Sequence, residues 1–238
     1  MKNFVFISPN FPTNYWQFCH HLKENGLRVL GVGDQPYDEL LPELKASLTE
    51  YYKVGSMENY DEVYRAVAFF ISKYGRIDWL ESNNEYWLER DAMLRTDFHI
   101  TSGFQTSDME RIKYKSKMKP YYEAVGIKTA RYHIVDNYDA CKKFIDLVGY
   151  PVIVKPAHLG SSIGITLARN EEEAKLGIES AFCIDNRVVI ERYLENKKDV
   201  NCAAYSLQGK IILSEPELAF GEGIYSFEDK YLRRSNDH

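Results

Sequence analysis

The stretch that decides the fold is residues 149–166, GYPVIVKPAHLGSSIGIT. An apolar, β-branched run ends in Lys155, a loop rich in glycine and serine follows, and a second β-branched run comes after the loop. A buried strand that ends in lysine presents an ammonium group to an anion, and small residues let backbone N–H groups close over phosphates. The order is therefore typical of a site for a nucleoside triphosphate. On this stretch alone, a hairpin with a flexible loop and a snorkelling lysine is the alternative.

Composition and charge exclude several classes of function. The chain has 238 residues, of which 45% are hydrophobic and 27% charged, as is ordinary for a soluble protein of one large or two small domains. The net charge of −5 argues against a nucleic-acid or anionic-membrane surface. No window approaches the about 20 apolar residues of a membrane span. The four scattered cysteines predict reduced thiols of a cytoplasmic protein rather than a zinc site.

The first hundred residues alternate between strand and helix patterns. Apolar runs predict strands at 3–8, 27–32 and 77–80, and helical spacing predicts helices at 15–24 and 60–74. This order predicts a parallel, doubly wound sheet. The segment Gly31-Val32-Gly33-Asp34 resembles part of a dinucleotide fingerprint, but it follows the second strand and lacks the third glycine. A nicotinamide cofactor is therefore the weaker interpretation of this half.

The second half is predicted to be α+β with antiparallel strand pairs. Asp136 and Asn170 are expected to cap two helices, and Gln208-Gly209 is a plausible tight turn of a hairpin. Strands are expected at 152–155, 163–167, 188–191, 200–205 and 210–213.

A run of lysines precedes this half: Lys113, Lys115, Lys117 and Lys119. Residues spaced by two cannot all share one face of a helix, so at most one or two of these side chains can point into a pocket. The others are expected to be solvated.

The segment 188–195, VVIERYLE, has features of a purine-binding strand. Backbone groups at a strand end can pair with the ring edge, and apolar side chains can cover the ring faces. A carboxylate a few residues later, Asp199, can accept hydrogen bonds from ribose hydroxyls. Taken alone, the segment also fits an ordinary strand with a charged exit; the order of lysines, loop and strand end favours the nucleotide.

Four segments together resemble the ATP-grasp superfamily, most closely D-alanine–D-alanine ligases and related carboxylate–amine ligases. They are KYKSKMKPYYEAVGI (113–127), YPVIVKPAHLGSSIGIT (150–166), VVIERYLENKKD (188–199) and GIYSFEDKYL (223–232). The resemblance implies a Rossmann-like pre-ATP-grasp domain over residues 1–104 and an ATP-grasp domain over residues 105–238.

The resemblance also implies a role for each matching residue. ATP phosphates are expected to contact Lys115 and Lys155, with Lys230 near the terminal phosphate as the catalytic lysine. The adenine ring is expected to lie against Ile153 and to bind Glu191 and Leu194. The resemblance further implies that Gly160, Ser161 and Ser162 form a loop that covers the phosphates. It implies that Asp199 binds the ribose. The spacing between Glu191 and Asp199 is one residue longer than in relatives, so Lys198 is the alternative.

The implied reaction joins two small molecules. ATP phosphorylates a substrate carboxylate to an acyl phosphate, and an amine then attacks the acyl carbon. The protein supplies position and positive charge, and Mg2+ normally supplies the remainder.

One part of the family pattern is missing. Such enzymes hold magnesium with late acidic residues, but residues 231–238 contain one acid, Asp237, and the Glu-x-Asn at Glu81-Ser82-Asn83 lies in the first domain. We therefore expect no metal ligands in this chain, and we expect it to be the front part of a longer ligase. The loop at 81–85 is better interpreted as the carboxyl end of a parallel strand, where Glu85 could face a substrate.

Two other functions are open at this point. A non-catalytic ATP-binding regulatory module or pseudoenzyme fits the missing acids, and a Rossmann-type oxidoreductase fits the first half. A homodimer is the commonest assembly for such a chain.

Overall fold

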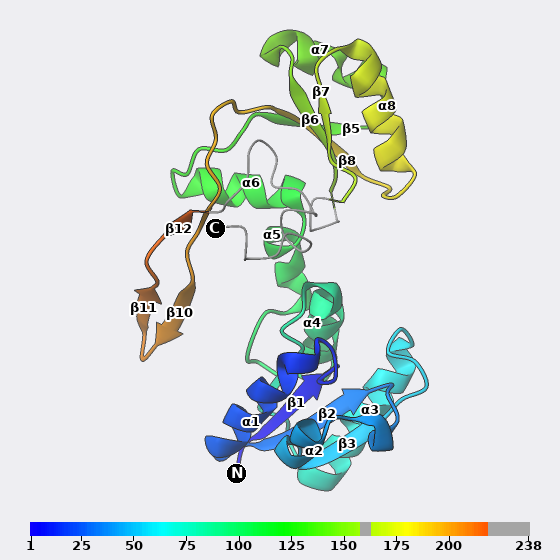
Figure 1. Cartoon of the computed structure of the whole chain (residues 1–238), viewed down its shortest axis with the longest axis vertical. Helices are drawn as coiled ribbons and strands as arrows, with labels where there is room; N and C mark the ends of the chain where they lie inside the picture. The colour runs from blue at the N-terminus through cyan, green and yellow to red at the C-terminus, as the bar shows by residue number, and fades with distance from the viewer. Residues whose placement is uncertain (158–162, 219–238) are drawn as a thin grey trace, which may run out of the picture. The chain divides into compact units, whose positions relative to one another are not determined.

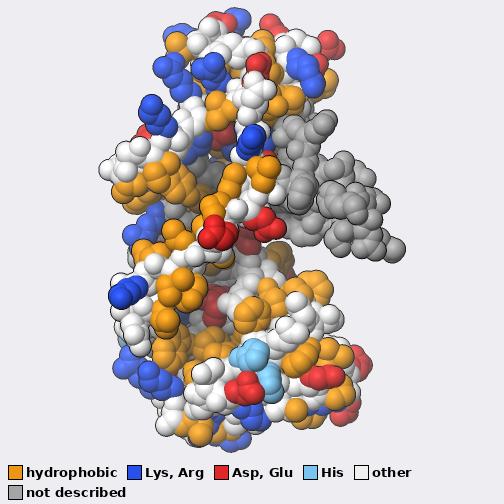
Figure 2. Space-filling view, turned by 60° about the vertical axis from the view of Figure 1, so that its left-hand side comes forward, with side chains coloured by type: hydrophobic (Ala, Val, Ile, Leu, Met, Phe, Trp, Pro, Cys, Tyr) orange, Lys and Arg blue, Asp and Glu red, His pale blue; other side chains and the backbone are white. Residues whose placement is uncertain are grey.

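The computed structural model describes residues 1–157 and 163–218, apart from the side chains of residues 115 and 116. The chain divides into two compact units, Met1–Glu110 and Arg111–His238 (Figure 1). Figure 2 shows acidic and basic side chains interspersed over the visible face. No helix in the described ranges combines the length and the apolar character needed to cross a bilayer.

The first unit is built on a parallel sheet of four strands in the order β3-β2-β1-β4. The strands are β1 (Asn3–Ile7), β2 (Arg28–Gly33), β3 (Glu50–Lys53) and β4 (Trp79–Glu81). The helices are α1 (Trp16–Glu24), α2 (Pro42–Ser47), α3 (Tyr60–Tyr74) and α4 (Leu88–Asp97), with short 3-10 turns at Thr13–Tyr15, Tyr37–Glu39, Glu85–Trp87 and Thr106–Asp108. Parallel pairing is confirmed. The sequence pattern does not predict β3 or α4.

Both faces of this sheet are covered, which explains why its central strands β1 and β2 are apolar after their first residues, Asn3 and Arg28. Alternate residues of β1 enter different cores: Val5 packs with Val67 and Phe70 of α3, whereas Phe6 packs with Cys19 of α1. All five side chains are fully buried. The unit is therefore a three-layer α/β structure.

The glycines that resemble a dinucleotide fingerprint have a packing role instead. Gly31 and Gly33 lie inside β2, not in a turn between strand and helix. A Cβ on Gly33 would lie 2.8 Å from Oδ1 of Asn10 and 2.5 Å from the hydroxyl of Tyr51. The interpretation of this segment as a nicotinamide site is wrong, because the glycines admit neighbouring side chains rather than a pyrophosphate.

The second unit contains an antiparallel sheet in the order β5-β8-β6-β7. Its strands are β5 (Tyr132–Val135), β6 (Val152–Pro156), β7 (Thr166–Ala168) and β8 (Val188–Arg192). Helices α7 (Tyr138–Val148) and α8 (Glu171–Phe182) cover one face and share a single core with it. The core includes Val152, Val154, Ile145 and Ile178.

The remaining elements of this unit are short. They are α5 (Met109–Ile112), α6 (Lys115–Ala124), the pair β9 (Val200–Asn201) and β12 (Glu217–Leu218), and the hairpin β10 (Ala204–Leu207) and β11 (Lys210–Leu213). The hairpin turn is confirmed, with Gln208 and Gly209 at φ +50° and +77°, as a type I′ turn requires.

One predicted helix cap is confirmed and the other is wrong by one residue. Asn170 Oδ1 accepts the backbone N–H of Glu173 at 2.9 Å and caps α8. Asn137, not Asp136, caps α7, because its Oδ1 accepts the N–H of Ala140 at 2.9 Å. Asp136 lies one residue too early for this bond, which spans three residues from cap to donor.

Candidate functional site

The face of the second sheet opposite α7 and α8 gathers the predicted nucleotide residues. Along β6, Val152 and Val154 enter the core, so Ile153 and Lys155 point to the other face. The register pairs Ile153 with Glu191 of β8 and Lys155 with Val189. Because paired residues of antiparallel strands share a face, three of the predicted residues, Ile153, Lys155 and Glu191, are neighbours on one surface of the sheet.

Glu191 lies between two lysines. Its Oε2 is 2.7 Å from Nζ of Lys155, and its Oε1 is 3.1 Å from Nζ of Lys119. The Lys119 ammonium also donates to the carbonyl of Ala130 at 2.9 Å and lies 5.0 Å from the centre of the Tyr132 ring. Lys119 and Glu191 are only 9% and 8% exposed. The cluster therefore ties α6, β5, β6 and β8 together at one point.

The cluster has an unbalanced charge and an unused acceptor. Two ammonium groups face one carboxylate, so the cluster carries one net positive charge, which attracts an anion. Glu191 Oε1 is buried and accepts no hydrogen bond from the described residues, since its contact with Lys119 has poor geometry for one. The ammonium at 3.1 Å balances the charge of this oxygen, which can still accept a hydrogen bond. A ligand that brings both an anionic group and an N–H donor would satisfy both deficits.

Lys119 belongs to the cluster but was missed among the predicted site residues. The lysine run predicts that one or two of its members point inward, and Lys119 does so. It lies one helical turn after Lys115, the first residue of α6. This spacing of four was the available signal, because residues at i and i+4 share a helix face.

The other predicted residues fall into two groups. Leu194 is half exposed after β8, and the Asp199 carboxylate pairs with Nζ of Lys197 at 2.7 Å. Outside the described residues lie Gly160, Ser161, Ser162 and Lys230, together with the side chain of Lys115.

The chain leaves the loop after β6 through a glycine that has no room for a side chain. Gly164 has φ +69°, and a Cβ there would lie 2.9 Å from Cγ of Pro156 and in contact with Ile184. Both its conformation and its neighbours require glycine. The exit of the predicted phosphate loop is thus fixed by packing against the end of β6.

In the first unit, the loop after β4 is held by a buried polar network. The Asp91 carboxylate accepts from the hydroxyl and N–H of Ser82 at 2.5 and 2.9 Å. Burial raises the pKa of Asp91 to about 7. The Arg95 guanidinium, 1% exposed, donates to Glu81 Oε2 at 3.1 Å and to the Leu80 carbonyl at 2.8 Å. The Glu81-Ser82-Asn83 segment is therefore the loop at a strand end, as predicted, and Glu85 begins the short 3-10 turn that follows.

Comparisons with known proteins show the family of the chain. A family model described as D-ala D-ala ligase C-terminus matches residues 120–238, half of the chain. The chain belongs to this family of ATP-grasp ligases. The match includes β6, β8 and all but the first five residues of α6, so Lys155 and Glu191 fall inside the family's region and Lys119 immediately before it.

Curated relatives of this ATP-grasp chain are D-alanine–D-alanine ligases. The enzyme of Campylobacter lari is 36% identical over 118 residues, which are 50% of this chain and 33% of that enzyme. The enzyme of Halalkalibacterium halodurans is 31% identical over 142 residues, 59% of this chain and 46% of that enzyme. The matched residues thus span between a third and a half of these relatives.

Solved structures share the fold over most of the ATP-grasp chain. An L-amino acid ligase from Bacillus licheniformis superposes with a TM-score of 0.70 at 16% identity, covering 94% of this chain and 52% of that one. An N5-carboxyaminoimidazole synthetase from Staphylococcus aureus, complexed with ADP, gives 0.70 at 17% identity, covering 93% and 55%. These similarities support a mixed α/β fold of the ATP-grasp type.

Proposed function

We propose that the chain is the nucleotide-binding part of an ATP-dependent carboxylate–amine ligase. In this proposal residues 1–104 form a Rossmann-like pre-ATP-grasp domain, and residues 105–238 belong to the ATP-grasp domain. The observation that carries it is the Lys119–Glu191–Lys155 cluster on the sheet face opposite α7 and α8, because its net positive charge and its Glu191 oxygen without a hydrogen-bond donor match an adenine nucleotide.

The proposed contacts divide between the base and the phosphates. Glu191 accepts a hydrogen bond from the exocyclic amine of adenine, Ile153 lies against the ring and Leu194 borders its edge. Lys155 exchanges part of its ion pair with Glu191 for a phosphate oxygen. Lys119 then remains the counter-ion of Glu191 and keeps its carboxylate in place. The roles proposed for the other residues follow the family pattern: Lys115 and Lys230 at the phosphates, Gly160, Ser161 and Ser162 over them, and Asp199 at the ribose.

The proposed reaction forms an amide in two steps. An oxygen of the substrate carboxylate attacks the terminal phosphorus of ATP, and the bond to ADP breaks. The amine then attacks the acyl carbon, loses a proton and displaces inorganic phosphate. Lysine ammonium groups stabilise charge on the phosphate oxygens, and Glu85 is a candidate for contact with a substrate.

A bound Mg2+ would neutralise phosphate charge in such a reaction. In the described part of the second unit, no three His, Cys, Asp or Glu side chains converge as metal ligands. The proposed reaction therefore assigns no metal ligand to the described residues of the second unit.

A two-stage experiment tests the proposal. Thermal shift with ATP, ADP and NAD, with and without Mg2+, distinguishes an adenine-nucleotide site from an oxidoreductase. Stabilisation by ATP and ADP that disappears in Lys155→Ala supports the site, whereas stabilisation by NAD alone contradicts it. Release of ADP that requires both a carboxylate and an amine then supports a ligase.

A further inference from the structure

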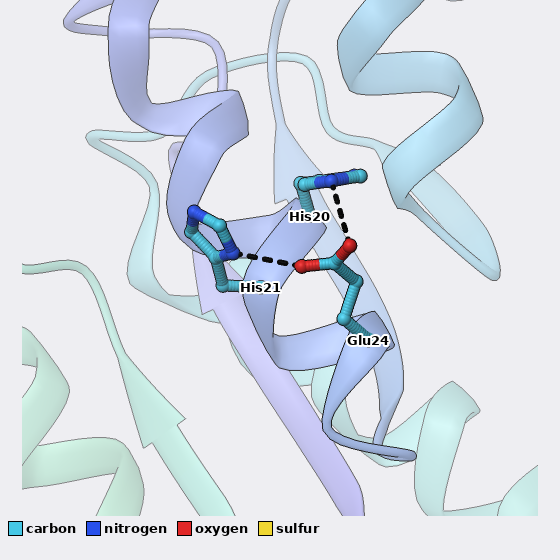
Figure 3. A group of neighbouring side chains, drawn as sticks. All are labelled: His20, His21 and Glu24. Carbon is cyan, nitrogen blue, oxygen red and sulfur yellow. Dashed lines mark hydrogen bonds and ion pairs between the residues drawn. The ribbon is translucent and has the colours of Figure 1, made fainter.

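Helix α1 of the first unit carries three metal-ligating side chains that converge on its solvent-facing side. They are His20, His21 and Glu24 (Figure 3). Their ligand atoms all lie within 4.8 Å of one another, and they are the one such group among the residues that the structure describes. Their side chains are 47%, 71% and 59% exposed. Figure 2 shows exposed histidine side chains (pale blue) beside an acidic one.

The helix spacing explains how one carboxylate reaches both rings. Consecutive residues differ by about 100° around a helix, so His20 and His21 diverge at their Cα atoms. Glu24 lies four residues after His20 and three after His21, and both spacings place side chains on the same face. Its Oε1 is 3.3 Å from Nε2 of His20, and its Oε2 is 2.9 Å from Nδ1 of His21.

The helix that carries these ligands is fixed on its other side. Cys19 is fully buried in the core beneath the sheet, and Nζ of Lys23 donates to the carbonyl of Ala46 in α2 at 2.7 Å. Only side-chain rotations are needed to move the three ligands.

We propose that His20 Nε2, His21 Nδ1 and the Glu24 carboxylate bind one divalent transition-metal ion. Bonds of about 2.1 Å in a tetrahedral site separate neighbouring ligand atoms by about 3.4 Å, close to the distances already present between Glu24 and each imidazole. Two imidazoles and one carboxylate suit Zn2+, Ni2+ or Cu2+ rather than Mg2+. Water completes the coordination at this exposed position.

Titration of the untagged protein with NiCl2 tests this site. The exposed cysteines Cys183 and Cys202 are first replaced by serine, so that thiolates do not compete. Calorimetry is expected to show one Ni2+ per chain. Because the Trp16 ring lies 6.2 Å from that of His20, binding is also expected to quench tryptophan fluorescence, and Trp16→Phe is expected to remove most of the quenching while preserving the heat of binding.

Single substitutions separate this site from adventitious binding. His20→Gln, His21→Gln and Glu24→Gln are each expected to weaken Ni2+ binding at least about tenfold. His99→Gln, at another exposed histidine of the same unit, is expected to leave it unchanged. Zn2+ is expected to displace Ni2+, and millimolar Mg2+ is not. No binding, or equal affinity in all four variants, would overturn the proposal; loss in the histidine variants but not in Glu24→Gln would overturn the three-ligand site.

Discussion

Replacement of Lys119 by methionine tests whether Lys119 balances the charge of Glu191 and so leaves Lys155 available to bind phosphate. The change keeps an unbranched apolar side chain that is one atom shorter and removes the ammonium group. It deletes the 3.1 Å contact with Glu191 and the 2.9 Å hydrogen bond to Ala130. Glu191, 8% exposed, then depends on Lys155 alone.

The magnitude follows from burial and from the partner that remains. Removing one partner of a buried ion pair costs about 3–5 kcal/mol, but Glu191 retains its 2.7 Å contact with Lys155. We therefore expect a loss of about 2–3 kcal/mol, which lowers Tm by about 4–12 °C. The retained pair also holds Lys155 away from phosphate, so the Kd for ATP is expected to rise about tenfold, or about 1.4 kcal/mol.

Thermal unfolding and calorimetric titration with ATP measure the two effects. Lys128→Met is the control, because it removes an exposed lysine that follows the same helix and is expected to change stability by less than about 0.5 kcal/mol. In Lys119→Met/Glu191→Gln, where no carboxylate is left unbalanced, part of the lost stability is expected to return. Equal Tm and equal ATP affinity in the two single methionine variants would refute the reasoning.

Two further predictions concern stability. Because burial raises the pKa of Asp91 to about 7, the folded state binds an extra proton at this carboxyl between about pH 4 and 7, and the contribution of Asp91 to stability falls as pH rises through this range. In urea unfolding, the change of stability with pH should therefore be more positive in Asp91→Asn than in the wild type, and the same pH dependence in both proteins would contradict the raised pKa. Gly164→Ala should lower the free energy of unfolding by at least about 1 kcal/mol more than Gly149→Ala does, since both glycines have positive φ but only Gly164 of the two lacks room for a Cβ. Equal losses in urea unfolding would show that Pro156 and Ile184 move to admit the methyl group.

Strong local patterns made much of the fold predictable. Helix α3 has an apolar stripe ended by Gly75, and the turn between β10 and β11 has a glycine, Gly209, at a position of positive φ, so both were identifiable without tertiary information. Strand β3 has neither an apolar periodicity nor a characteristic turn residue. Its four residues, EYYK, lack β-branched side chains, and only pairing with β2 makes them a strand.

Part of the candidate site was predicted from the sequence. Lys155 was expected from its place at the end of an apolar run, whereas Ile153 and Glu191 were expected from the resemblance to ATP-grasp ligases. The alternation of β6 and its antiparallel pairing with β8 place all three on one face of the sheet. Lys119 was not predicted, because its spacing of four from Lys115 indicates a shared helix face but not which face of α6 lies beside β5 and β8. The ion pairs of Glu191 are likewise properties of tertiary structure.

The most direct test of the central claim is the affinity of the chain for ATP, measured by calorimetry in the wild type, Lys155→Met and Lys175→Met. Lys175 is a suitable control because it belongs to the same unit and pairs with Glu171 at 2.8 Å on the exposed side of α8. The proposed site predicts saturable binding of one ATP, at least about tenfold weaker in Lys155→Met and unchanged in Lys175→Met. Binding that is equally strong in all three proteins would contradict a nucleotide site on the face formed by β6 and β8.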